Sequence, residues 1–199
     1  MRSLLEPISP AVPAADEKSR VRASDPPQRV WRIVSKAKRS QVPAWVVGRL
    51  VHEALRCWRF PSEGFEAFLS PFALEAGLTD QAEIHAAIQE AGRLLDRFRA
   101  HPLYAEIDSA ERHHEVPYFL PEGRGIIDLL YRGAAGWVII DFKTDEVRSD
   151  EEVRTVIREN GYDQQVARYA QAVAAQIEIQ TKTRLVFLNV DNNIVIFDL

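Results

Sequence analysis

Two apolar segments on either side of a short glycine-bounded stretch constrain this chain most, because each contains one aspartate. The stretch GIIDLLYRGAAGWVIIDFK has the β-branched and aromatic residues typical of strands, with the letters GAAG (residues 133–136) where a turn is expected. If these four residues form the hairpin loop, the register that pairs Arg132 with Trp137 also places Asp128 opposite Asp141. Unpaired carboxylates in apolar strands are unfavourable, so the pattern indicates a site where a divalent cation offsets their repulsion.

A lysine completes this pair of acids. Lys143 lies two residues after Asp141, so strand periodicity places both side chains on one face. An ammonium beside a metal-bound carboxylate can orient an attacking water or stabilise charge that develops on a phosphate. We therefore predict Asp128, Asp141 and Lys143 as catalytic residues of metal-assisted phosphodiester hydrolysis, with Mg²⁺ or Mn²⁺ as cofactor. The structural alternative is that both aspartates face solvent on an exposed sheet.

The charge of the chain is divided unevenly between a basic N-terminal part and an acidic remainder. Residues 1–43 contain nine Lys and Arg against four Asp and Glu, although the whole chain has a net charge of −4. The first thirty or so residues are rich in Pro, Ala and Ser, and such a composition buries too little apolar surface to offset chain entropy. We expect a flexible basic arm or linker over residues 1–43 that contacts nucleic-acid phosphates. The alternative is a solvated tail with an incidental excess of arginine.

Residues 44–199 have the periodicities of one mixed domain. Two helical stretches come first, and His101-Pro102 would end the second. Three strand-like segments follow, then a long helical stretch broken at an Asn-Gly pair, then two strands joined by the hairpin signal Asp-Asn. This order predicts an α/β fold with a central mixed β-sheet flanked by helices. We expect helices at 44–60, 80–99 and 150–177, and strands at 113–120, 125–131, 136–143, 183–190 and 193–199.

Composition excludes several classes of protein. Cys57 is the only cysteine, which excludes a disulfide framework and cysteine-rich zinc or iron–sulfur sites and favours a reducing, cytoplasmic setting. Its place beside an apolar stripe predicts a core position. No apolar run approaches the ~18 residues that span a bilayer, so we expect no membrane contact. No Walker-type glycine loop is present, so the chain cannot drive a nucleotide motor by itself.

Four motifs in one order resemble those of the PD-(D/E)xK nuclease superfamily. More narrowly, they resemble the C-terminal nuclease domain of RecB/AddA-type helicase–nucleases, related to UvrD-like helicases. The match covers about residues 44–190. This sequence supplies Gly48-x-x-x-His52, Asp128, Asp141-Phe142-Lys143-Thr144 and Gln165-x-x-x-Tyr169.

The resemblance implies a restriction-endonuclease-like core and a set of site residues. His52, Asp128 and Asp141 would bind the metal, helped by the Phe142 backbone carbonyl, and Lys143 would be the catalytic lysine. The implied activity is a DNA exonuclease in recombinational repair, acting on single strands or duplex ends in the bacterial cytoplasm. A UvrD/RecB-type helicase would be the partner, in the same chain or in another.

The remaining positions have structural alternatives. By the resemblance, Gln165 and Tyr169 support the site or contact the phosphate strand, and their i, i+4 spacing places them on one helix face with Tyr162 nearby. Tyr162 and Tyr169 could equally pack an ordinary amphipathic helix on the sheet. His52 borders an apolar stripe and could be a core histidine. Glu115 resembles an accessory acid of the family but could equally be a charge at the sheet edge.

Two rival functions stay open at this point. One is a non-catalytic module with the same fold that binds nucleic acid or a partner. The other is a nuclease of a different branch, such as a restriction or CRISPR-associated enzyme.

Overall fold

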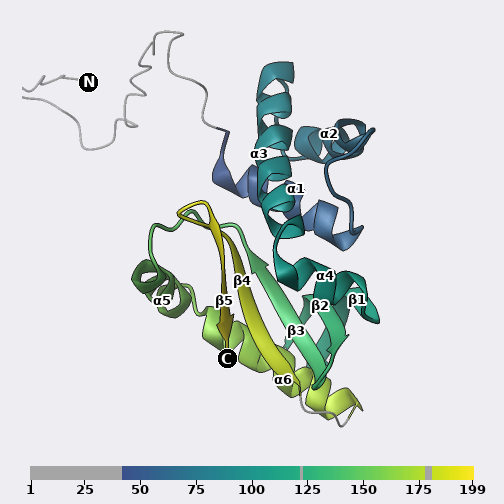
Figure 1. The fold of residues 1–199 in the computed structure, drawn as a ribbon, viewed down its shortest axis with the longest axis vertical. Coiled ribbons are helices and arrows are strands. Elements are labelled where there is room, and N and C mark those ends of the chain that lie inside the picture. Colours follow the sequence, from purple (N-terminus) through teal and green to yellow (C-terminus); the bar gives the residue numbers. More distant parts are fainter. Residues whose placement is uncertain (1–41, 122, 178–180) are drawn as a thin grey trace, which may run out of the picture. The chain divides into compact units, whose positions relative to one another are not determined.

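A five-stranded mixed sheet separates two layers of helices in the computed structural model, which describes residues 42–121, 123–177 and 181–199 (Figure 1). Four helices precede the sheet in the chain and pack on one face. Two more pack on the other face. The helices are α1 (Ala44–Arg56), α2 (Phe65–Glu75), α3 (Gln81–Arg99), α4 (Pro102–Asp108), α5 (Asp150–Glu159) and α6 (Tyr162–Ile177).

The strands follow the order β1-β2-β3-β4-β5 across the sheet. Every neighbouring pair is antiparallel except β3 and β4, which are parallel and are joined by the crossover that contains α5 and α6. The predicted α/β fold with a mixed sheet between helices is confirmed. The strands are β1 (Arg112–Leu120), β2 (Gly123–Gly133), β3 (Gly136–Lys143), β4 (Lys182–Val190) and β5 (Asn193–Asp198).

The β2–β3 hairpin has the predicted register but a shorter loop. Arg132 pairs with Trp137, as expected. Gly133 also pairs with Gly136, so the loop consists of two residues and not four. Gly136 has a φ of 125°, a conformation that glycine adopts without the penalty of a side chain. The register of the strands is unaffected by this correction.

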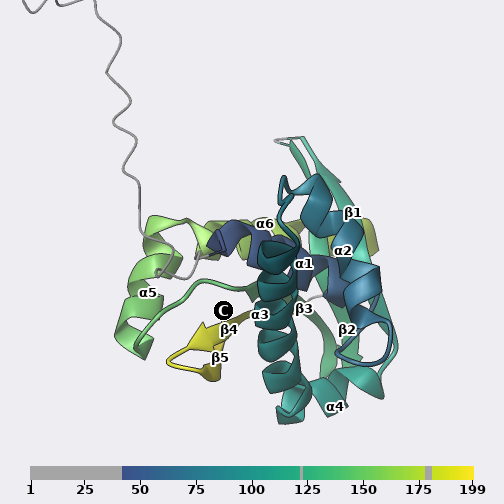
Figure 2. The same ribbon diagram turned by 90° about the horizontal axis from the view of Figure 1, so that it is seen from above.

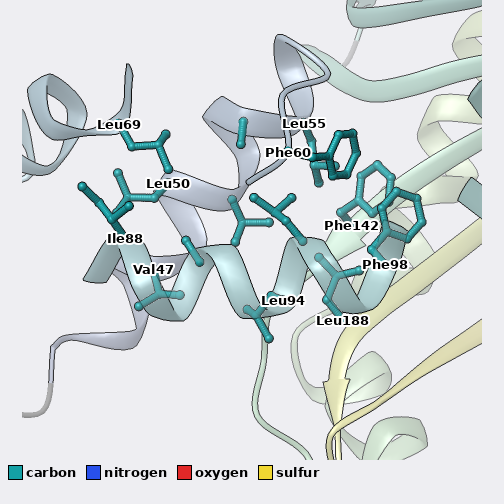
Figure 3. Close-up of a cluster of buried hydrophobic side chains, with 14 of the residues drawn as sticks. Val47, Leu50, Leu55, Phe60, Leu69, Ile88, Leu94, Phe98, Phe142 and Leu188 are labelled. Carbon is teal, nitrogen blue, oxygen red and sulfur yellow. The ribbon is translucent and has the colours of Figure 1, made fainter. Parts of the chain in front are cut away.

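The first hydrophobic core lies between the sheet and α1–α4. In Figure 3, Phe98 of α3 meets Phe142 of β3, with ring centroids 5.2 Å apart. Leu50 of α1 and Leu188 of β4 belong to the same cluster and are fully buried. Burial of one such side chain contributes about 1.5–3 kcal/mol.

The second core lies on the opposite face, under α5 and α6. Val153 of α5 and Val166 of α6 pack with Ile139 of β3 and Phe187 of β4. The alternation along β3 divides its residues between the two cores, since Ile139 joins this cluster and Ile140 the first. The middle strand is therefore buried on both faces.

Two helices were absent from the sequence-based prediction, and one was too long. Helix α2 contains Pro71 in its interior, and α4 has only 7 residues, so neither has a clear helical period. The second predicted helix does end before Pro102, but this proline then starts α4, with the His101 side chain accepting from Leu103 N. The first helix stops at Arg56, short of the predicted residue 60.

Cys57 directly follows α1 and is exposed, which contradicts its predicted place in the core. The predicted arm over residues 1–43 lies almost entirely outside the described residues and stays a prediction. Within the described ranges, no helix is long and apolar enough to cross a membrane.

Candidate active site

Three acidic residues occupy neighbouring positions on β1, β2 and β3. In the β1–β2 register, Glu115 stands opposite Asp128, between the pairs His114↔Leu129 and Val116↔Ile127, but neither acid forms a backbone pair there. Glu115 has a φ of 52°, which is rare for a residue with a side chain. The ladder is therefore interrupted at the row that contains the acids. Such irregularities frequently re-aim side chains next to active sites.

The strands β2 and β3 separate at the same row. Their backbone ladder ends at Leu129↔Ile140, whereas β3 continues its pairing with β4 as far as Lys143. At the next position, Asp128 Oδ2 accepts a hydrogen bond from the Phe142 backbone N at 2.9 Å. The carboxylate thus takes the place of a backbone acceptor and is held beside the strand that carries Asp141. If the confirmed register is continued by one position, Asp128 stands opposite Asp141, as predicted. The backbone pairing of β2 with β3, however, ends one position before this pair.

Asp141 is a buried carboxylate, with a residue exposure of 2%. Burial, followed by the charge of Asp128, raises the pKa of Asp141 to about 6, against the opposing influence of Lys143 and His52. The ammonium of Lys143 lies 2.7 Å from Asp141 Oδ2. Among the described residues, this ammonium is the only polar contact of the buried Oδ2.

Four side chains from β3 and α6 form a closed ring of polar contacts. Lys143 Nζ donates to Gln165 Oε1 at 3.0 Å, and Gln165 Nε2 donates to the Tyr169 hydroxyl at 2.5 Å. The Tyr169 hydroxyl donates to Asp141 Oδ1 at 3.4 Å, and Asp141 Oδ2 contacts Lys143. Because Gln165 and Tyr169 are one helical turn apart, a single face of α6 supplies both contacts.

Tyr169 stays protonated in this ring. Burial, followed by the charges of Asp141 and Asp128, raises the pKa of its hydroxyl. A protonated hydroxyl can accept from Gln165 and donate to Asp141 at the same time. Tyr169 is also packed in the second core, which confirms the predicted packing; its role in the site stays a prediction.

Tyr162 holds the other side of the lysine. The Lys143 ammonium lies over the Tyr162 ring, 3.8 Å from its centroid, and the Tyr162 hydroxyl donates to Asp145 Oδ2 at 3.2 Å. Asn160 Nδ2 donates to the same hydroxyl. The sequence does not predict Asp145 and Asn160 as site residues, because they approach Lys143 only through Tyr162, after the crossover has folded back onto β3. The one sequence feature that could have indicated Asp145 is its position directly after the Asp-x-Lys-Thr motif.

His52 reaches the acids from the other helical layer. Its Nδ1 lies 3.6 Å from Asp128 Oδ1, and the side chains are 38% and 19% exposed, so both remain accessible to a ligand. Burial lowers the pKa of His52, but the hydrogen bond and charge of Asp128 outweigh it, and the net direction is upward. The helix α1 thus brings an imidazole to Asp128 while α6 holds Asp141. The structure brings together His52, Asp128, Asp141, Lys143, Gln165, Tyr169 and Tyr162, with Glu115 beside Asp128.

Glycines allow close approaches on both sides of the site. A Cβ added to Gly48 would lie 2.7 Å from Thr144 Oγ1, so α1 can approach the end of β3 only where it carries glycine. A Cβ on Gly125 would lie 2.6 Å from the Tyr118 ring, which covers this position of β2. The Gly-x-x-x-His and Asp-x-Lys-Thr patterns are therefore linked by a steric contact. The contact could not be predicted from the sequence, because Gly48 and Thr144 are far apart in the chain.

The donor set fits a hard divalent cation. Two carboxylates and an imidazole lie close together, and the only polar contact of the buried Asp141 Oδ2 among the described residues is Lys143. Within the part of the chain that the structure describes, no three His, Cys, Asp or Glu side chains form a ready-made metal cluster. Lys143 supplies positive charge beside the acids. The Phe142 carbonyl stays a predicted ligand; its residue lies between Asp141 and Lys143, with its N–H bonded to Asp128.

Comparison with known proteins matches this geometry to one family. The model of the PD-(D/E)XK nuclease superfamily matches residues 28–197, which include every helix and strand described above apart from Asp198, the last residue of β5. A comparison with curated proteins finds no match. The family match covers most of the chain, and its span contains both acids, the lysine and the crossover helix that holds them. The chain therefore belongs to the PD-(D/E)XK nuclease superfamily.

Proposed function

We propose that this protein is a metal-dependent deoxyribonuclease that hydrolyses phosphodiester bonds at Asp128, Asp141 and Lys143. Family membership supports nuclease activity in general. The single observation that carries the finer proposal is the ring that holds the Lys143 ammonium 2.7 Å from the buried Asp141 Oδ2. Burial of one carboxylate next to a second one is energetically unfavourable, and carboxylates perturbed in this way are concentrated at functional sites.

Each residue has a distinct part in the proposed reaction. Asp128, Asp141 and His52 would hold Mg²⁺ or Mn²⁺, with the Phe142 carbonyl as a further ligand. The cation would supply charge stabilisation and a more acidic water. Lys143 would orient the attacking water and stabilise the negative charge that develops on the phosphate.

The surrounding groups keep the lysine in place. Gln165 accepts from Lys143, and Tyr162 lies against its ammonium, so the ammonium has few alternative positions. Tyr169 fixes the second oxygen of Asp141. Glu115 would hold a metal-bound water or a second cation from its place opposite Asp128.

The biological setting extends this proposal. The Gly-x-x-x-His and Gln-x-x-x-Tyr motifs support the RecB-like branch, and hence an exonuclease that acts on single strands or duplex ends in recombinational repair. A UvrD/RecB-type helicase would be its partner, and the bacterial cytoplasm its location. The Gly48–Thr144 approach and the α6 ring give these two motifs physical roles in one site.

A cleavage assay tests the proposal. End-labelled single-stranded, double-stranded and circular DNA are incubated with the full chain in Mn²⁺, Mg²⁺ or chelator. We expect cleavage of linear DNA with either metal and none in chelator, while circular DNA persists if the enzyme is an exonuclease. DNA binding without cleavage in any metal would instead support the non-catalytic module.

A further inference from the structure

We propose that a hollow between the β1–β2 hairpin and α6 binds the phosphate backbone of a single DNA strand through Arg124 and Arg168. The inference rests on the proposed DNA nuclease activity and adds a substrate-binding subsite to it. This subsite lies outside the group of acids and the lysine. Its parts are exposed cations, a partly apolar wall and an aromatic link to the candidate active site.

The hollow has a volume of about 190 Å³ and is lined by residues of both elements. Arg124 and Gly123 come from the start of β2, and Arg168 comes from the middle of α6. Tyr118 and Leu120 of β1 complete the lining. Figure 1 shows α6 lying along the sheet, and Figure 2 shows the β1–β2 hairpin projecting beyond the neighbouring helices.

Both arginines are exposed, and neither has an ion-pair or hydrogen-bond partner among the described residues. Some other arginines of the domain are held in ion pairs: Arg49 pairs with Glu75, and Arg184 pairs with Asp198. An arginine without a partner gives up no internal contact when it binds an anion. Its planar guanidinium matches two phosphate oxygens at once.

The hollow is connected to the acids through two aromatic rings. Tyr118 lines the hollow and packs edge-on against Tyr169, with ring centroids 5.4 Å apart. The Tyr169 hydroxyl in turn donates to Asp141 at 3.4 Å. Arg168 directly precedes Tyr169 on α6. A DNA strand whose phosphate is bound in the hollow could therefore reach the carboxylates, because only Tyr118 and Tyr169 lie between the hollow and Asp141 in this series of contacts.

An exposed aromatic residue favours a single strand over a duplex. Phe119 pairs with Arg124 across the hairpin and is 65% exposed, which is unusual for a large apolar side chain. Unpaired bases stack on such rings, and cationic grooves beside them follow the backbone. Bases paired inside a duplex do not present their faces in this way. Because alternate residues of a strand face opposite sides of the sheet, Phe119 lies outside the hollow that Tyr118 and Leu120 line, beside its cross-strand partner Arg124. A base stacked on Phe119 would therefore flank the phosphate bound by Arg124.

Fluorescence anisotropy of a labelled oligothymidylate of about twelve nucleotides provides the test, since sites for single strands cover roughly 4–16 nucleotides. Binding is measured in chelator over a series of salt concentrations, with the full chain and with Arg124→Ala, Arg168→Ala and the double variant. We expect each single change to weaken binding about fivefold and to reduce the slope of log affinity against log salt by about 0.7.

Arg158→Ala is the matched control, because Arg158 is an exposed arginine near the end of α5, away from the hairpin. It should bind as the unaltered chain does. Phe119→Ala should weaken binding of the single strand but leave the salt slope unchanged, and it should not affect a blunt duplex. Equal loss for a duplex would overturn the assignment to a single strand.

The outcomes separate this subsite from the nuclease proposal. If Arg124→Ala and Arg168→Ala both bind like the control while the unaltered chain cleaves DNA in Mn²⁺, the subsite is wrong and the nuclease proposal stands. If binding depends on the two arginines but no metal supports cleavage, the subsite stands as a binding site and the proposed chemistry fails.

Discussion

The helices α1–α4 and the helices α5–α6 cover opposite faces of one sheet, yet they meet the same acids with different chemistry. The first layer packs a large apolar core on the sheet and brings His52 to Asp128. The second layer places Gln165 and Tyr169 in a polar ring around Asp141 and Lys143. Stability should therefore respond most to changes in the first layer, and catalysis most to changes in the polar ring.

The largest effect is expected at Lys143. Its replacement by Ala removes the cation that contacts Asp141, while the carboxylates and His52 remain. Loss of one preorganised stabilising group at a transition state lowers the rate by about a hundredfold to a thousandfold. Cleavage of end-labelled DNA in Mn²⁺ measures this loss.

Lys182→Ala serves as the control for Lys143→Ala, because Lys182 is an exposed lysine at the start of β4. It should cleave at the unaltered rate. DNA affinity, measured in chelator, should be similar for both variants. A rate near that of the unaltered chain for Lys143→Ala would mean that the polar ring is not the reacting site.

A substitution in the apolar core under α1–α4 should lower stability more than it affects catalysis. Phe98→Ala removes a fully buried ring that packs on Phe142, and we expect a loss of about 3–5 kcal/mol in the free energy of unfolding. Chemical denaturation gives this value, with Phe119→Ala as the control because that ring is mostly exposed. The milder Phe98→Leu keeps the domain folded if Ala does not.

One result would contradict this division of roles between the two helical layers. If Phe98→Leu abolished the stabilisation of the protein by Mn²⁺, the apolar layer would be controlling metal binding as well as stability. We expect the rise in melting temperature with Mn²⁺ to persist, because a ligand that binds only the folded state stabilises it by mass action.

Asp141→Asn should uncouple stability from metal. The change removes one buried charge and keeps the shape, so the metal-free protein should be as stable as the unaltered chain or more stable. Millimolar Mn²⁺ should raise the melting temperature of the unaltered chain and of Asp96→Asn, an exposed control on α3. For Asp141→Asn, this rise should largely vanish. Equal stabilisation of all three proteins would exclude Asp141 as a ligand.

The pH dependence of the metal-free protein gives a smaller, independent signal. Because the folded state raises the pKa of Asp141 to about 6 from the ordinary 3.8, the folded protein retains a proton that the unfolded chain has lost. Stability is therefore higher below this window and falls as pH rises through it, by up to about 1 kcal/mol per pH unit. The raised pKa of His52 likewise makes the folded protein less stable as the pH rises.

Asp141→Asn should remove the Asp141 share of this slope and leave that of His52. Urea denaturation in chelator at stepped pH values measures both proteins. Parallel curves for the two would show that Asp141 has an ordinary pKa in the folded state.

A loss of stability smaller than that of Phe98→Ala is expected where α1 approaches β3. Gly48→Ala places a methyl group 2.7 Å from Thr144 Oγ1, and we expect a loss of about 1–3 kcal/mol. Thr144→Ala removes the atom that clashes. In a double-mutant cycle, the pair should be more stable than the sum of the single losses predicts. Strict additivity would show that the two positions do not touch.

The sequence predicts those parts of the molecule that depend on neighbouring residues. The strands, the register of the β2–β3 hairpin and the break before α6 follow from local patterns, since alternation and glycine positions specify them directly. The helices α2 and α4 do not, because one contains Pro71 and the other is shorter than two full turns. Their positions are fixed by packing on α3.

The candidate site divides in the same way. The Asp128 and Asp141 positions and the face that Lys143 shares could be predicted from strand periodicity. The contact of Asp145 with Tyr162 and the meeting of the two arginines at the hollow could not, because they join segments that come together only when the crossover folds onto the sheet. Sequence spacing contains no information on which loop returns to which strand end.

The parallel pairing of β3 with β4 has a consequence for the order in which the molecule can fold. Until the residues of β4 arrive, β3 is an edge strand that is apolar on both faces and has unpaired backbone groups along one side. During synthesis, this edge stays unpaired until about forty further residues, which include the crossover helices, have emerged. A fragment that ends before Lys182 should accordingly aggregate through β3, even though every proposed metal ligand and the lysine are already present in it.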